Sequence, residues 1–127
     1  MLQSYEGGCH CGRVRFRIQV DLADTIIGEC NCSICTKKGI LHLPVLYERL
    51  EILSGADVLA TYQFNTGTAK HTFCRHCGIH AFYVPRSDPD KISVNARCLE
   101  GIDPAALKPT SFFDGRNWEE AQAARKK

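Results

Sequence analysis

The sequence predicts a small, mainly antiparallel β domain that ends in one helix. Three observations support this fold class: an early run of strictly alternating residues, several short β-branched or aromatic runs between turns, and a C-terminal stretch of helix formers. In residues 13–20, every second residue from Val14 to Val20 is apolar and the residues between them are polar. Such alternation is typical of a strand with one buried face, so we expect a strand over residues 13–20.

Further strands are predicted along the middle of the chain, where apolar runs alternate with turn residues at 21–24, 54–57 and 65–67. The runs are rich in β-branched and aromatic residues, which favour strands. Their aromatic side chains, Tyr62, Phe64, Phe73 and Phe82, are expected in the core. The predicted strands are residues 25–30, 41–46, 50–53, 58–64, 71–73, 81–84 and 91–96.

The C-terminal part of the chain has a different character. Residues 103–116 contain two prolines and a glycine and are predicted to form a loop. Asn117 can cap a helix, and Glu120, three residues later, completes a pattern like a capping box. Because acidic residues come early and basic residues late in 118–127, the helix dipole favours a helix over this range.

Length and charge narrow the function classes. The 127 residues suffice for one domain and not for two, so residues 1–127 are predicted to be a single domain. No apolar run is long enough to span a membrane, and the first eight residues do not resemble a signal peptide, so a cytoplasmic protein is expected. Nucleic acid is not an expected partner: the net charge is only +2, and Arg13, Arg15 and Arg17 come with no base-reading motif.

The eight cysteines fall mostly into closely spaced groups, which in a cytoplasmic chain favour metal ligands over disulfides. Cys9 and Cys11 can present both sulfurs on one side of an extended chain, between glycines that let the backbone adjust. Cys74 and Cys77 form a C-x-x-C turn typical of a zinc half-site. Together they predict one closed four-cysteine zinc site, against the alternatives of disulfides, free thiols or an iron–sulfur cluster.

A second group, Cys30, Cys32 and Cys35, has the spacing C-x-C-x-x-C, which lets all three sulfurs reach one ion. Catalytic zinc is held by three protein ligands with one exchangeable position. The sequence therefore predicts a catalytic zinc at these residues, with substrate in the fourth position. The protein residues that could instead supply a fourth ligand are Cys98, His42 and His80.

The ligand set of the second group narrows the chemistry. Three thiolates around Zn²⁺ leave a net negative charge, which weakens the ability of the ion to acidify water compared with three neutral histidines. Soft thiolates also suit a soft exchangeable ligand. A reaction of a substrate thiol therefore fits this site better than hydrolysis does. Zinc favours the deprotonated thiol, which is a nucleophile for a carbon electrophile.

The motifs "GGCHCG", "CNCSIC" and "HTFCRHCG", in this order, resemble the glutathione-dependent formaldehyde-activating enzyme family. The terminal domain of centromere protein V is similar too, through "YQFNT" and "HTFCRHCG". The resemblance covers about residues 5–120. It implies a mostly β, Mss4-like fold built around zinc.

The resemblance also implies two zinc ions per chain and a reaction. The structural zinc would be held by the group Cys9, Cys11, Cys74 and Cys77, and the catalytic zinc by the group Cys30, Cys32 and Cys35. The implied reaction joins glutathione to formaldehyde as S-hydroxymethylglutathione, which is a carbon–sulfur lyase reaction in reverse.

Glutathione carries two carboxylates, so a cationic rim is expected beside the catalytic cysteines, and the candidate contacts are Lys37, Lys38 and Arg97. Two other functions stay open at this point. One is a non-catalytic zinc module that binds protein or chromatin, and the other is a redox or metal-buffering thiol protein. No feature of the sequence indicates an oligomeric state.

Overall fold

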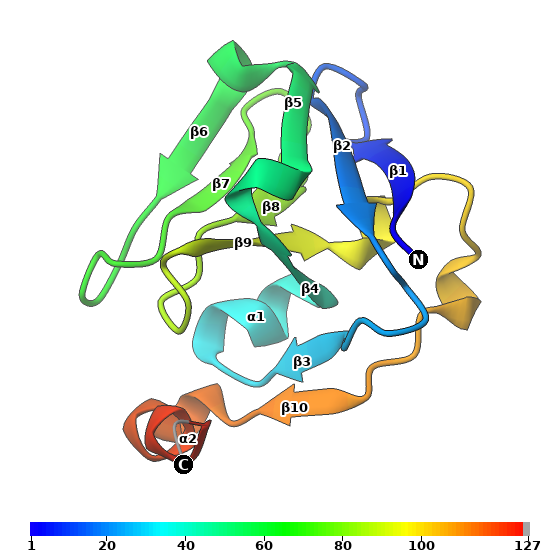
Figure 1. Ribbon diagram of the computed structural model, residues 1–127. Coiled ribbons are helices and arrows are strands. Elements are labelled where there is room, and N and C mark those ends of the chain that lie inside the picture. Colours follow the sequence, from blue (N-terminus) through cyan, green and yellow to red (C-terminus); the bar gives the residue numbers. More distant parts are fainter. Residues whose placement is uncertain (126–127) are drawn as a thin grey trace.

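The computed structural model describes residues 1–125, and most of its regular structure is strand (Figure 1). The strands are β1 (Gln3–Gly8), β2 (Arg15–Val20), β3 (Gly28–Cys30), β4 (His42–Leu46), β5 (Leu50–Ser54), β6 (Leu59–Tyr62), β7 (His71–Cys74), β8 (Phe82–Tyr83), β9 (Lys91–Asn95) and β10 (Ser111–Phe113). The α-helices are α1 (Ser33–Lys38) and α2 (Trp118–Arg125). Short 3-10 helices are η1 (Tyr47–Arg49), η2 (Ala56–Val58), η3 (Ala96–Cys98), η4 (Pro104–Ala106) and η5 (Gly115–Asn117).

The strands form three small sheets, with the orders β1-β2-β5, β10-β3-β4-β9-β8 and β6-β7. Antiparallel pairing dominates, as predicted: β2 is antiparallel to both β1 and β5, and β4 is antiparallel to β9. The exception among the described strands is β10, which runs parallel to β3 and places Phe113 opposite Cys30. The mainly β fold class with a short C-terminal helix is confirmed.

Three elements differ from the predicted set. No strand was expected at β1, because its mostly exposed residues lack apolar alternation. The loop predicted over residues 103–116 is wrong at 111–113, where a three-residue strand gains its hydrogen bonds from β3. No helix was predicted after Cys32, but helix α1 forms there and ends at Gly39, whose φ of 65° suits glycine.

The core confirms the alternation predicted for β2. Val14, Phe16 and Ile18 are completely buried, and the Phe16 ring meets the edge of Phe82 at a centroid distance of 5.8 Å. The polar face of β2 is charge-balanced, since Arg15 binds Glu100 and Arg17 binds Glu6 and Glu51. These arginines therefore do not form a free basic patch.

Two aromatic residues that were expected in the core are exposed. Tyr62 is 52% exposed and Phe64 38% exposed, whereas Phe82 is buried as expected and Phe73 is half-buried. Both exposed rings belong to the end of β6 and the turn that follows it, which projects beyond the sheet. Strand propensity identified this segment, but it could not show that the segment leaves the core.

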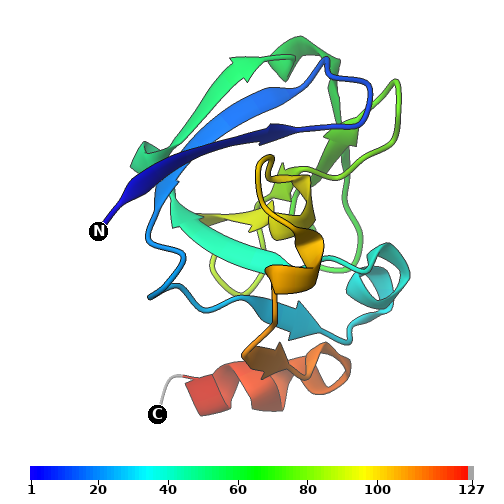
Figure 2. The same ribbon diagram turned by 90° about the vertical axis from the view of Figure 1, so that its right-hand side faces the viewer.

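Helix α2 lies beside β10 at the end of the molecule opposite β1 and β2, as two perpendicular views show (Figure 1, Figure 2). It begins at Trp118, directly after Asn117, and is described to Arg125; residues 126–127 of the predicted helix lie outside the described residues. The amide of Asn117 donates to Asp114 Oδ2 at 2.9 Å. None of the described helices combines the length and the apolar character needed to cross a membrane.

Candidate metal centres

The first cysteine cluster joins two distant parts of the chain. The four sulfur atoms of Cys9, Cys11, Cys74 and Cys77 all lie within 4.8 Å of one another. Cys11 Sγ is 3.5 Å from Cys9 Sγ and 3.7 Å from Cys74 Sγ. Zinc–sulfur bonds of about 2.3 Å in a tetrahedron place sulfurs about 3.8 Å apart, so this donor set fits zinc.

Tight turns bring these sulfurs together. Cys9 and Cys11 lie in a turn rather than on the extended chain that was expected, and Gly12 follows with a φ of 84°. Cys74 and Cys77 are joined by the predicted turn, in which the Gly78 N–H donates to the Cys74 carbonyl at 2.8 Å. Each half-site is thus shaped locally, and folding brings the two halves together.

Polar groups around the first cluster favour thiolates. The Val14 N–H donates to Cys9 Sγ at 3.3 Å. The backbone N–H and the guanidinium of Arg13 lower the pKa of Cys11 to about 6. Because a cation binds cysteine only as thiolate, both contacts assist metal binding.

The second cluster, Cys30, Cys32 and Cys35, is formed by the end of β3 and the start of α1. Its three sulfurs also lie within 4.8 Å of one another. Cys32 caps α1, because its Sγ accepts from the Cys35 N–H at 3.4 Å, and the Cys32 N–H donates to Cys30 Sγ at 3.5 Å. The helix cap and the metal-ligand geometry are therefore one local structure.

The three thiols of the second cluster compete for negative charge. Hydrogen bonds from Cys30 and then Cys35 lower the pKa of Cys32 to about 2. Contacts with Cys30 and then Cys32, together with burial, raise the pKa of Cys35, and the contact with Cys32 raises the pKa of Cys30. Binding of a cation by all three sulfurs must therefore release protons.

None of the candidate fourth ligands, Cys98, His42 and His80, joins the second cluster. No other His, Cys, Asp or Glu of residues 1–125 places a ligand atom within 4.8 Å of all three sulfurs. Cys98 Sγ faces the His80 carbonyl at 3.8 Å, and burial raises its pKa to about 11. The His80 Nδ1 accepts from Lys38 Nζ at 2.8 Å, and the His42 Nδ1 lies 3.1 Å from Ser93 Oγ.

The second cluster lines a cavity of about 950 Å³. The C-terminal segment forms one wall, through residues of β10, η5 and α2. The opposite side is lined by Phe64, His71 and Tyr83. The three thiols can therefore be reached by a small molecule from solvent, because the cavity that they line is open.

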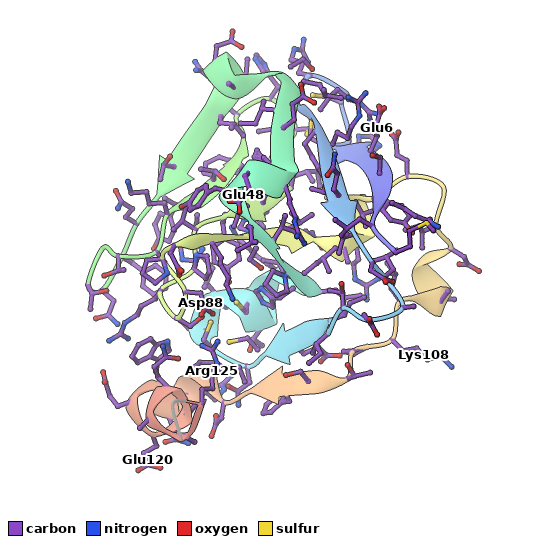
Figure 3. The ribbon with its side chains drawn as sticks, in the orientation of Figure 1. Glu6, Glu48, Asp88, Lys108, Glu120 and Arg125 are labelled. Carbon is purple, nitrogen blue, oxygen red and sulfur yellow. The ribbon has the colours of Figure 1, made fainter. Side chains whose placement is uncertain are left out.

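The C-terminal wall is fixed to the segment that precedes β9. Arg125 donates to Asp88 Oδ2 at 2.9 Å, and both side chains point toward the space between α2 and the β9 side of the molecule (Figure 3). The Arg86 guanidinium lies 3.5 Å over the Trp118 ring and 3.1 Å from Glu119. These contacts hold α2 against the segment that precedes β9.

The same segment approaches the metal ligands closely at Gly115. A Cβ atom at this position would lie 2.8 Å from Cys30 Sγ and 2.6 Å from Cys32 Cβ, so a side chain does not fit. Asn31, between these two cysteines, donates to Asp114 Oδ1 at 2.9 Å and accepts from the Arg116 N–H at 3.1 Å. The C-terminal segment is thus locked onto the second cluster.

Comparison with known proteins agrees with this arrangement. Residues 4–116 match the family model described as glutathione-dependent formaldehyde-activating enzyme. The chain belongs to this family. The crystal structure of a Rhodobacter sphaeroides protein is similar as well, with 38% sequence identity and a TM-score of 0.75, over 84% of this chain and 98% of that chain. The resemblance seen in the cysteine motifs and the predicted fold class are thereby confirmed.

The three cations predicted to contact substrate are not among the residues that line the cavity. Lys37 is exposed on α1, and Lys38 turns its ammonium toward His80. Arg97 lies in η3, beside Cys98. The residues that line the cavity include two other cations, Lys91 and Arg116, for which no ion pair is observed within residues 1–125.

The sequence did not indicate the group of histidines that surrounds Tyr83. The Tyr83 ring stacks on His71 at 5.0 Å and lies 4.9 Å from His80 and 5.6 Å from His42. Burial lowers the pKa of His42 to about 4 and that of His80 to about 3, so both are neutral at pH 7. These residues come from three strands and a loop, and no spacing in the sequence connects them.

Proposed function

We propose that the protein is a zinc-dependent enzyme of the carbon–sulfur lyase type that acts on a small thiol. The substrates proposed are glutathione and formaldehyde, and the product is S-hydroxymethylglutathione. One observation carries the proposal: three clustered thiols line an open cavity, and no residue of the described chain completes their ligand set. Family membership supports the same reaction.

Two zinc ions per chain are proposed, within one zinc-binding domain over residues 1–127. The group Cys9, Cys11, Cys74 and Cys77 would hold the structural ion, since its four sulfurs satisfy a tetrahedral site. The group Cys30, Cys32 and Cys35 would hold the catalytic ion. Zinc bound there would supply the positive charge that keeps a substrate thiol deprotonated at neutral pH.

The residues around the second cluster then orient the reactants. The thiolate sulfur forms a bond to the carbonyl carbon of formaldehyde, the π electron pair moves onto the oxygen, and the oxygen takes up a proton. The cavity is large enough for both reactants, and its wall is held in place by the contacts of α2. Lys37, Lys38 and Arg97 remain proposed partners of the glutathione carboxylates, and Lys91 and Arg116 are added because they line the cavity.

Cobalt substitution tests the proposal. Co²⁺ in place of zinc makes both thiolate sites visible by absorption, and glutathione is expected to change the bands of one site only. S-methylglutathione keeps both carboxylates but has no free thiol, so it should leave the spectrum nearly unchanged. If no small thiol alters the bands, the second site is closed, and the non-catalytic binding module replaces the enzyme as the best interpretation.

A further inference from the structure

The Tyr83 side chain lies in the cavity of the second cluster. Tyrosine is not one of the common zinc ligands, so another role has to be considered. The side chain is only 7% exposed, yet it lines the cavity that contains Cys30, Cys32 and Cys35. The Tyr83 side chain and the three thiols therefore face the same space. A substrate sulfur held by this cluster would therefore lie near the Tyr83 hydroxyl.

A donor is needed at this position. When the π electrons of a carbonyl group move onto its oxygen, negative charge develops beside a cluster whose three thiolates would leave a net negative charge even with Zn²⁺ bound. Like charges repel strongly in a partly buried site, so the oxygen must be stabilised by a hydrogen-bond donor. A tyrosine phenol is neutral at pH 7, so Tyr83 can act as a hydrogen-bond donor.

His42 holds the Tyr83 hydroxyl in one orientation. The His42 Nδ1 lies 3.2 Å from the Tyr83 oxygen and 3.1 Å from Ser93 Oγ. The buried His42 Nε2 has no hydrogen-bond partner among the described residues, which favours the tautomer with the hydrogen on Nδ1, because an unpaired buried N–H is costly. Nδ1–H then points to the two hydroxyl oxygens, and the Tyr83 hydrogen is free to face the cavity.

We propose that Tyr83 is a catalytic residue that donates a hydrogen bond to the aldehyde oxygen as the carbon–sulfur bond forms, and that His42 is its positioning residue. This inference rests on the proposed function. In the forward direction the proton lost by the thiol goes to solvent, and the oxygen takes one up from solvent while Tyr83 stabilises it. In the reverse direction Tyr83 stabilises the same oxygen as its proton leaves and the carbon–sulfur bond breaks.

The central test compares Tyr83→Phe with Tyr62→Phe in the zinc-loaded protein. Tyr62 is a matched control, since it belongs to the same stacked aromatic row but is exposed and lies outside the cavity lining. The measurement is the exchange rate between formaldehyde hydrate and S-hydroxymethylglutathione by NMR exchange spectroscopy. Tyr83→Phe is expected to lower the enzymatic rate about 100- to 1,000-fold, the range of losses for one donor to a developing oxyanion, and Tyr62→Phe should leave it unchanged.

Two further readouts separate this role from a structural one. Tyr83→Phe should keep its metal content and the change that glutathione causes in the cobalt spectrum, because a donor to the aldehyde oxygen is not needed for thiol binding. His42→Leu should lower the rate at saturating glutathione, and His42→Asn should restore part of it, since the asparagine amide can take the place of Nδ1. If Tyr83→Phe loses metal, the rates of His42→Leu and His42→Asn test the role of the Tyr83 hydroxyl instead.

The outcomes distinguish the two proposals. A wild-type protein that does not accelerate exchange overturns both the proposed function and the role of Tyr83. A wild-type protein that accelerates exchange, together with a Tyr83→Phe variant as fast as Tyr62→Phe, overturns only the role of Tyr83. A His42→Leu variant with the wild-type rate shows that His42 is not the positioning residue. If Tyr83→Phe has also lost its metal, this result overturns the whole proposal.

Discussion

The two cysteine clusters use the same ligand atom in opposite ways. The first connects the β1–β2 turn to the end of β7, and Cys11 and Cys74 are 63 positions apart in the chain. The second is contained within residues 30–35, where β3 passes into α1. A cation at the first cluster would bind distant segments together, whereas a cation at the second would add little to a local turn that is already shaped by its own helix cap. Under the proposed function, the four-cysteine cluster would serve folding and the three-cysteine cluster would serve chemistry.

Single serine substitutions give the largest expected difference between the clusters. Cys74→Ser removes a ligand that joins distant segments, so the protein should lose cooperative unfolding and both metal ions. Cys32→Ser should lose one of about two zinc equivalents and all activity, and keep most of its thermal stability. Thermal melts by circular dichroism, with zinc content by elemental analysis, measure both effects.

If both variants unfold alike, both clusters are structural, and the proposed difference between them is wrong. Iron in place of zinc, or about one metal ion per wild-type chain, would contradict the two-site proposal itself. Cys98→Ser is a useful control, because Cys98 belongs to neither cluster and should keep both ions.

A substitution at Gly115, which is not a metal ligand, should affect the second cluster and not the first. Gly115→Ala would place a methyl group 2.8 Å from Cys30 Sγ, so the second cluster must distort and its metal content should fall, while the first cluster keeps its ion. Gly28→Ala in β3 is the matched control, because its added Cβ would lie 3.9 Å from the nearest atom. Equal metal content in the two variants would show that the C-terminal segment can move away from Cys30 without cost.

The smallest effect is expected from the cations around the second cluster. Neutralising Lys37 and Lys38 together should weaken glutathione binding by about 0.5–1 kcal/mol for each charge, as is typical of exposed pairs, without a change in metal content. The pair Lys91→Gln and Arg116→Gln tests the cations that line the cavity. Titration of the cobalt protein with glutathione compares the two double variants, and the pair with the larger loss identifies the carboxylate contacts.

Much of this site could be predicted from the sequence because zinc ligands are set by short-range spacing. Cys30, Cys32 and Cys35 meet within one turn of chain, and Cys74 and Cys77 are joined by a turn with glycine after it. The alternation of β2 likewise fixed its buried face. Local structure of this kind can be predicted from a sequence because it is determined by residues that are close together in the chain.

The cavity could not be predicted, since it is made by contacts between remote segments. Strand β10 has only three residues and exists through its pairing with β3, and Tyr83 meets His42 across 41 positions of the chain. The exposed position of Phe64 was missed for a related reason: residue type favours burial, but the turn after β6 carries the ring to the rim of the cavity. A single sequence has no signal for such pairings.

The family match ends at residue 116, and helix α2 begins at Trp118. The part of the cavity wall that α2 supplies is therefore an accessory to the metal-binding framework, attached through Trp118 and Arg125. In evolutionary terms, one wall of the cavity could change while the metal-binding framework stays the same. Exchange of the C-terminal helix between relatives would be a route to new specificities that leaves every cysteine untouched.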